Sequence, residues 1–291
     1  MKTSKALLVL VSLIGVLALI AAGAGVFWQG GGSGPFPFTT VRGETVTIHG
    51  RGLYRFDTES AVAQAVAADA VTLGLGLPLL IVSACLYRRG SLRGALLLAG
   101  TLGYFLYTYA SMAFMSAFNP LFLIYVALFS LSLFAFILAL MSIRADELPA
   151  RFSPRLPRRA IAGLLFVIGA FLTMAWLGRI VPALFSDAPP FGLESYSTLV
   201  IQVLDLGLIV PLAVLAGVLL LRRRPFGYLL AAVALTKGFT MAVAVAAMGV
   251  NQWLVGVAVS HAEVLIFVVL ALATVGMTLV LLGHVLPEPA A

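Results

Sequence analysis

Residues 121–143 read LFLIYVALFSLSLFAFILALMSI and contain no charged side chain. An uninterrupted apolar run of about twenty residues is what a helix needs to cross a hydrocarbon layer roughly 30 Å thick. Seven further apolar runs resemble it, at residues 6–28, 63–87, 95–118, 160–185, 198–221, 226–250 and 257–284. A segment inside lipid must satisfy its own backbone hydrogen bonds, and the two-residue alternation of a membrane barrel is absent. The sequence therefore predicts an all-α integral membrane protein with eight transmembrane helices.

The composition agrees with a lipid environment. Of 291 residues, 62% are hydrophobic and 10% are charged, and the mean hydropathy is +1.11, whereas soluble domains are nearer half apolar and a quarter charged. The formal net charge of +7 comes from short basic clusters without interleaved aromatic residues, so we expect the bilayer as a partner and no nucleic acid. The lone Cys85 excludes an intrachain disulfide, and its apolar surroundings predict a buried packing role.

The basic residues predict the orientation of the chain. They gather in alternate loops, which the positive-inside rule places in the cytoplasm: Lys2 and Lys5, then Arg88, Arg89 and Arg93, then residues 144–159, then Arg222, Arg223 and Arg224. Both termini are then cytoplasmic, and the protein belongs in the cell's inner membrane. The first apolar run also suits a cleavable secretory signal, which would leave seven spans in the same orientation.

An internal repeat emerges when the sequence is shifted by 133 positions (211 − 78). Pro78 then falls on Pro211 and Gly94 on Gly227, with no gap between residues 73 and 115. A unit of four spans keeps its orientation when repeated, so this predicts two parallel four-helix repeats. They comprise residues 1–143 and 160–291, joined by a cytoplasmic linker at 144–159 that contacts anionic headgroups. The alternative is a duplication retained for folding alone.

The first loop has no counterpart in the second half. This insert, residues 29–62, begins with a glycine-rich run and continues with strand-like segments at 38–42 and 44–48 around Gly43. The pattern predicts a small extracytoplasmic β-hairpin. Its functional interpretation is a lid over an outward-facing cavity, and its structural interpretation is a spacer between the first two helices.

Charged groups at bilayer depth are costly unless paired or hydrated, so each is a candidate functional residue. The shift of 133 aligns Asp69 with Gln202 and Thr72 with Asp205, so each half carries a polar pair on one helix face. We predict that Asp205 faces Lys237 directly. The candidate ligand-binding residues are Asp69, Thr72, Tyr104, Tyr107, Arg179, Gln202, Asp205, Lys237, His261 and Glu263. The alternative is that these groups only neutralise one another within the bundle.

No catalytic, metal-binding or cofactor-binding signature is recognisable. The three histidines are not at ligand spacing, and no nucleophile elbow or cysteine pair occurs. We therefore expect no cofactor and favour binding or transport of a small or amphipathic, lipid-like solute through an outward-facing polar cavity. A sensor or assembly partner that binds another membrane protein is the second hypothesis, and an intramembrane enzyme is the third.

Overall fold

The computed structural model describes residues 3–186 and 188–287. Within them, eight helical spans are long and apolar enough to cross a membrane: Lys5–Phe27, Glu59–Arg88, Leu92–Met115, Phe122–Ser142, Arg158–Leu184, Val200–Leu221, Pro225–Leu254 and His261–Gly283. The predicted helical class and the number of spans are confirmed, as expected of a multi-pass membrane protein. The second span begins four residues before its apolar run (63 − 59), and the seventh ends four residues beyond its run (254 − 250).

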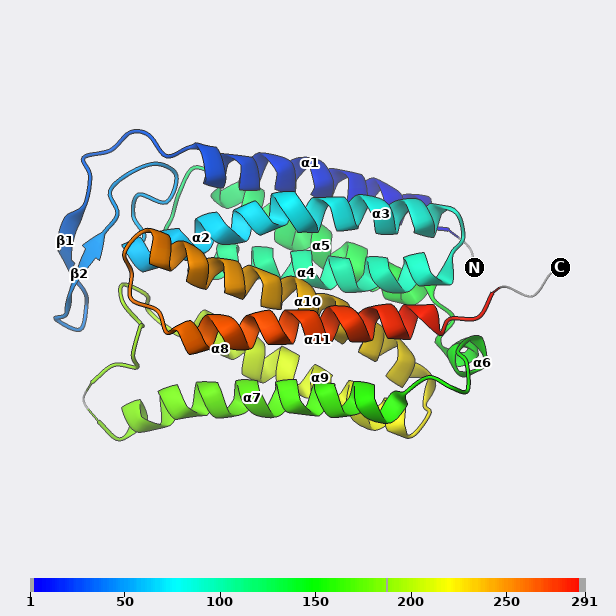
Figure 1. The fold of residues 1–291 in the computed structure, drawn as a ribbon. Helices are drawn as coiled ribbons and strands as arrows, with labels where there is room; N and C mark the ends of the chain where they lie inside the picture. The colour runs from blue at the N-terminus through cyan, green and yellow to red at the C-terminus, as the bar shows by residue number, and fades with distance from the viewer. Residues whose placement is uncertain (1–2, 187, 288–291) are drawn as a thin grey trace.

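Six spans are single helices, and two are interrupted by a π-helical turn; Figure 1 shows the helices side by side in one bundle. The single helices are α1 (Lys5–Phe27), α4 (Leu92–Met115), α5 (Phe122–Ser142), α7 (Arg158–Leu184), α10 (Pro225–Leu254) and α11 (His261–Gly283). The interrupted spans are α2 (Glu59–Val71), η1 (Thr72–Gly76) and α3 (Leu77–Arg88), and then α8 (Val200–Leu204), η3 (Asp205–Ile209) and α9 (Val210–Leu221). Between α5 and α7 lie the short η2 (Ala145–Glu147) and α6 (Leu148–Arg151).

Prolines account for both interruptions. Pro78 and Pro211 are the second residues of α3 and α9, and a proline inside a helix removes a backbone donor and crowds the preceding turn. The chain adapts with a π-helical turn in each case, in which the amide of Leu77 bonds the carbonyl of Thr72 and the amide of Val210 bonds that of Asp205. The two turns begin 133 residues apart (205 − 72).

The helices α4 and α10 form the centre of the bundle. In their most apolar windows 83% and 72% of the residues are buried, against 22% to 39% in the other six spans. Gly100 of α4 permits their close approach, because a Cβ atom there would lie 2.3 Å from Cβ of Thr236 on α10. The remaining helices surround this pair and expose apolar side chains outwards. Cys85 on α3 is among the exposed residues, so the prediction of a buried packing role was wrong.

A two-stranded antiparallel sheet occupies one end of the bundle, opposite α6 and opposite the start of α1 and the end of α11 (Figure 1). We call this the hairpin end. Strand β1 (Phe36–Thr39) pairs with β2 (Thr45–Ile48). The predicted hairpin is confirmed, but its first strand starts two residues earlier than expected and ends before the turn. Gly43 sits in that turn with φ +84°, which a residue with a side chain rarely adopts.

Candidate functional site

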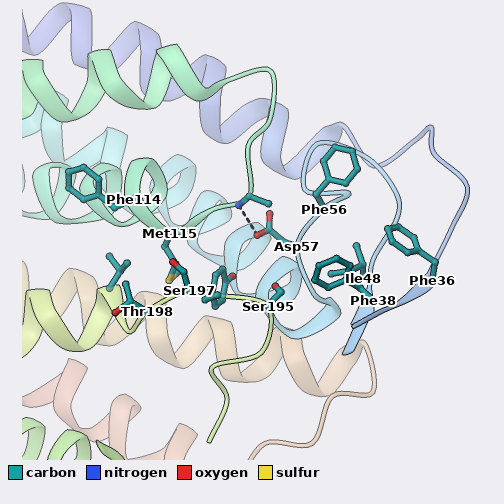
Figure 2. A pocket seen from close by; sticks show the side chains of 13 residues that line it. Phe36, Phe38, Ile48, Phe56, Asp57, Phe114, Met115, Ser195, Ser197 and Thr198 are labelled. Atoms are coloured by element: carbon teal, nitrogen blue, oxygen red, sulfur yellow. Dashed lines mark hydrogen bonds between the residues drawn. The ribbon is translucent and has the colours of Figure 1, made fainter. Parts of the chain in front are cut away.

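A pocket of about 500 Å³ opens at the hairpin end, between the hairpin, the end of α4 and the loop before α8 (Figure 2). Most of its wall is aromatic or aliphatic, with one carboxyl group and three hydroxyl side chains among the polar members. The lining residues are Phe36, Phe38, Ile48, Phe56, Asp57, Phe114, Met115, Ala117, Ser195, Tyr196, Ser197, Thr198 and Val200. A volume of 300–1,000 Å³ with an apolar wall and few polar groups is typical of ligand pockets.

Helix ends explain where the pocket lies. On one side of the bundle, α2 begins at Glu59 and packs against the long α10. Two amide side chains of α10 secure that contact: Asn251 Nδ2 donates to the carbonyl of Ala63 at 2.7 Å, and Gln252 Nε2 donates to Oγ of Ser60 at 2.9 Å. This side, which we call the α2–α10 side, is closed.

The corresponding place between α4 and α8 is open. Shifted by 133, Glu59 corresponds to Gly192 and the end of α4 at Met115 corresponds to Met248, yet α8 begins only at Val200 and α10 continues to Leu254. Both helix ends that close the α2–α10 side are therefore missing here. The loop at residues 195–198 and the side chains of the insert surround the space instead.

Two contacts tie the insert to the loop before α8. Nη2 of Arg42 donates to the carbonyl of Tyr196 at 2.5 Å, and the hydroxyl of Thr58 donates to the carboxylate of Glu194. These bonds join segments more than 130 residues apart. The insert therefore forms part of the pocket wall and is fastened to its far side.

Among the described residues, Asp57 is the one charged group in the pocket wall. Its side chain follows β2 and is 4% exposed, and Oδ1 accepts the backbone N–H of Ala117 at 3.0 Å (Figure 2). Burial raises the pKa of this carboxyl to about 6, against the opposing effect of the Ala117 hydrogen bond. Burial, followed by the charges of Asp57 and Glu194, raises the pKa of the Tyr196 hydroxyl well above its ordinary value. At neutral pH the pocket therefore holds a carboxylate beside a neutral phenol.

Deeper in the first half, Asp69 lies in a tyrosine cluster. Its Oδ2 accepts the hydroxyl of Tyr54 at 2.5 Å, and burial together with Asp69 raises the pKa of Tyr54 well above its ordinary value. The contact depends on Gly25 of α1, where a Cβ atom would lie 1.7 Å from Oδ2 of Asp69. One turn further along, Thr72 and Tyr104 share a hydrogen bond of 2.8 Å between their hydroxyls. Asp69 is thus enclosed by protein and has a neutral partner.

In the second half, Asp205 bonds to two other helices. Oδ1 accepts the hydroxyl of Tyr107 on α4 at 2.7 Å, and Oδ2 accepts Nε1 of Trp176 on α7 at 2.9 Å. Nζ of Lys237 lies 3.7 Å from the centre of the Tyr107 ring, a cation–π contact. In residues 3–186 and 188–287 no ion pair within 4.0 Å joins Lys237 to Asp205. The prediction of direct contact was wrong, because the ring of Tyr107 contacts the ammonium while its hydroxyl occupies the carboxylate.

The other predicted residues are more dispersed. Arg179 lies 5.9 Å from the ring of Trp176, and Gln202 is buried one turn before Asp205. His261 and Glu263 are exposed at the start of α11, where His261 stacks on Trp253 at 4.5 Å. None of the ten predicted residues lines the pocket described above. The structure thus brings Asp205, Tyr107 and Lys237 together with Trp176, and Thr72 with Tyr104, and leaves His261 and Glu263 apart.

Sequence reasoning missed Asp57, Tyr196 and Trp176. It considered charges inside the apolar runs, and Asp57 lies just before one of them. The sequence did contain a signal for Asp57. This acidic residue follows Phe56, and the first strand of the same insert also contains phenylalanines.

Comparisons do not supply a function. Within the described residues no group of three or more histidine, cysteine or acidic side chains could hold a metal ion. The chain matches no family model, no curated protein and no solved structure. The functional interpretation therefore depends on the geometry of this chain.

Proposed function

We propose that this multi-pass membrane protein binds a small amphipathic solute in the pocket at its hairpin end and transports it. The observation that carries the proposal is the pocket itself, which combines a mainly apolar wall with a buried carboxyl group and the hydroxyls of Ser195, Ser197 and Thr198. An apolar body and a polar head on one ligand would satisfy both parts of that wall. A partner-binding module, by contrast, needs no enclosed space between its helices.

A parallel four-plus-four repeat is part of the proposal. Its support is the agreement of element bounds after a shift of 133: η1 falls on η3, α3 falls on α9, and the starts of α4 and α10 coincide. The turns between these helices agree as well, since Gly90 and Arg223 both have positive φ. Transporters built from repeats place their substrate sites at the interface between the halves. The pocket lies between α4 of one half and the α8 segment of the other, as that rule expects, but at the hairpin end of the bundle and not at its middle.

The proposed orientation follows the basic clusters of the sequence. Arg88, Arg89 and Arg222–Arg224 lie in loops at the end opposite the hairpin, so that end faces the cytoplasm of the inner membrane and the pocket opens outwards. The buried groups around Asp69, Asp205 and Lys237 then lie between the pocket and the cytoplasmic side. We propose them as the residues that a transported solute meets next.

Saturable binding to purified protein in nanodiscs tests the proposal. The probes are tritiated decanol, decylamine and decanoate, which share a ten-carbon chain and differ in the head group. A pocket-filling variant, Ser197→Trp, should lower the affinity for the probes about tenfold or more, while Ser186→Trp, at an exposed position outside the pocket, should leave it unchanged. If neither variant alters binding, the probes partition into the lipid of the nanodisc and do not occupy the pocket. That result would contradict the proposed function.

A further inference from the structure

We propose that the solute carries a cationic, ammonium-type head group, which pairs with Asp57, and an apolar body held by the aromatic side chains of the pocket. This inference rests on the proposed function, because it names the class of ligand for the same pocket. It selects among three possible amphiphiles, namely cationic, anionic and neutral ones.

The first argument is the missing counter-charge of Asp57. In the described residues the ion pairs within 4.0 Å are His49 with Glu59 and Arg144 with Glu147, and neither involves Asp57. The protein gives this carboxylate one backbone N–H, from Ala117, although a buried charge without a paired cation is unfavourable. A ligand cation would supply what the fold does not.

The second argument is that Asp57 is held in place. Its own amide donates to the carbonyl of Tyr54 at 3.0 Å, and its carbonyl accepts the amide of His49 at 2.9 Å. With the Ala117 bond, three hydrogen bonds fix the residue between the strand and α2. A fixed carboxylate at the wall of a pocket is a preorganised partner for a cation.

The third argument concerns the rings around it. Five aromatic side chains line the pocket: Phe36, Phe38, Phe56, Phe114 and Tyr196. No lysine, arginine or histidine lines it in the part of the chain that the structure describes. The faces of aromatic rings attract cations, and aromatic cages are a common way to bind ammonium groups. The guanidinium of Arg55 already lies 4.9 Å from the centre of the Phe56 ring. The wall is therefore suited to positive charge, and it offers a carboxylate or phosphate hydroxyl donors but no cationic side chain among the described residues.

Other charges lie near the rim. Arg42 donates to the carbonyl of Tyr196, Arg55 lies on Phe56, and Glu194 accepts the hydroxyl of Thr58. Burial raises the pKa of Asp57 to about 6 and keeps the phenol of Tyr196 neutral, so the charge of Asp57 changes between pH 5 and 7.5. The nearest other titratable pair is His49 with Glu59, where the amide of His49 bonds the carbonyl of Asp57. The preference for a cationic head should therefore weaken at pH 5.

The test ranks the three ten-carbon probes on the same nanodisc preparation at pH 7.5. We expect decylamine to bind at least about tenfold more tightly than decanoate, with decanol between them. Asp57→Asn keeps an oxygen for the Ala117 amide and should remove most of the preference for decylamine while changing decanol affinity little. Lowering the pH to 5 should reduce the wild type's preference for decylamine over decanol, two probes whose own charges stay constant in this range, and should leave the variant unaffected.

The two proposals fail separately. If decanol and decanoate compete for the pocket and Ser197→Trp weakens both, but decylamine is not preferred, the cationic ligand class is wrong and the binding function stands. If no probe binds saturably, the proposed function itself is wrong. The head-group ranking uses the wild-type protein, so the test holds even if Asp57→Asn folds poorly.

Discussion

The two sides of the hairpin end differ in how far their helices extend, and one side is packed while the other is open. On the α2–α10 side, α10 extends to Leu254 and packs against the start of α2 at Glu59. Asn251 and Gln252 of α10 donate hydrogen bonds across this contact. On the α4–α8 side, α4 stops at Met115 and α8 starts at Val200, and a pocket occupies the space. A difference in where the helices end therefore separates a packed contact from a pocket at the same end of the bundle.

The largest expected effect is at the crossing of α4 and α10, because each of these helices belongs to one side of the hairpin end. Gly100→Val places side-chain atoms where Thr236 already lies, and overpacking of this kind should destabilise the protein by about 3 kcal/mol or more. The measurement is the apparent unfolding temperature in nanodiscs. Gly163→Val on α7 is the matched control, because nothing lies within 4 Å of its added Cβ atom. Equal unfolding temperatures for the two variants would contradict the role of this crossing.

The second prediction concerns the open side and pH. Asp57 has a folded pKa of about 6, raised from 3.8, so the folded state binds the proton more tightly than the unfolded state. The contribution of Asp57 to the free energy of unfolding is therefore largest below pH 3.8 and decreases as the pH rises towards 6. The Asp57→Asn variant does not undergo this pH-dependent decrease. Its free energy of unfolding should therefore exceed that of the wild type above pH 6, by about 3 kcal/mol at most.

The check is the difference in unfolding temperature between Asp57→Asn and the wild type, recorded from pH 4 to pH 7.5 without ligand. The difference should grow with pH and level off above about 6. Glu44→Gln is a suitable control, because Glu44 is exposed beside the turn of the same hairpin. A variant that is less stable than the wild type at pH 7.5 would mean that the Asp57 carboxylate stabilises the fold.

The third prediction concerns the closed side. Replacing Asn251 and Gln252 by leucine removes two bonds between helices and should cost about 1 kcal/mol, since such bonds average about 0.6 kcal/mol each in membrane bundles. Backbone hydrogen exchange at residues 59–66 should accelerate. Gln29→Leu is the control, because the Gln29 amide bonds only carbonyls of its own helix. Unchanged exchange at residues 59–66 would show that packing alone closes this side.

The sequence predicted the spans and the hairpin because each follows from local rules. Residues 121–143 have to be helical in lipid whatever surrounds them, and the strand-like residues on both sides of Gly43 predict a hairpin without tertiary information. The π-helical turns were not predicted, although Pro78 and Pro211 lie directly after them in the sequence.

The pocket could not be predicted in the same way. Its space depends on where α8 begins, and the predicted run started at residue 198, within the loop that lines the pocket. The contact of Asp205 was misjudged for a related reason, since distance along the chain favoured Lys237, whereas packing brought Tyr107 and Trp176 from two other helices. Contacts between different helices have no local signature in the sequence.

The smallest expected effect lies below the open side, where Tyr107 on α4 bonds Asp205 and so joins α4 to the interrupted sixth span. A buried pair in direct contact loses about 3–5 kcal/mol when one partner is removed, because the other charge is stranded. Here Lys237 rests on the ring of Tyr107, and Asp205 has two neutral donors. A double-mutant cycle with Asp205→Asn and Lys237→Met should therefore give a coupling of about 1 kcal/mol or less. A cycle of Tyr107→Leu with Lys237→Met should give a coupling of similar size, as expected for a cation–π contact. A coupling of about 3 kcal/mol or more between Asp205 and Lys237 would mean that the two charges meet directly in the membrane.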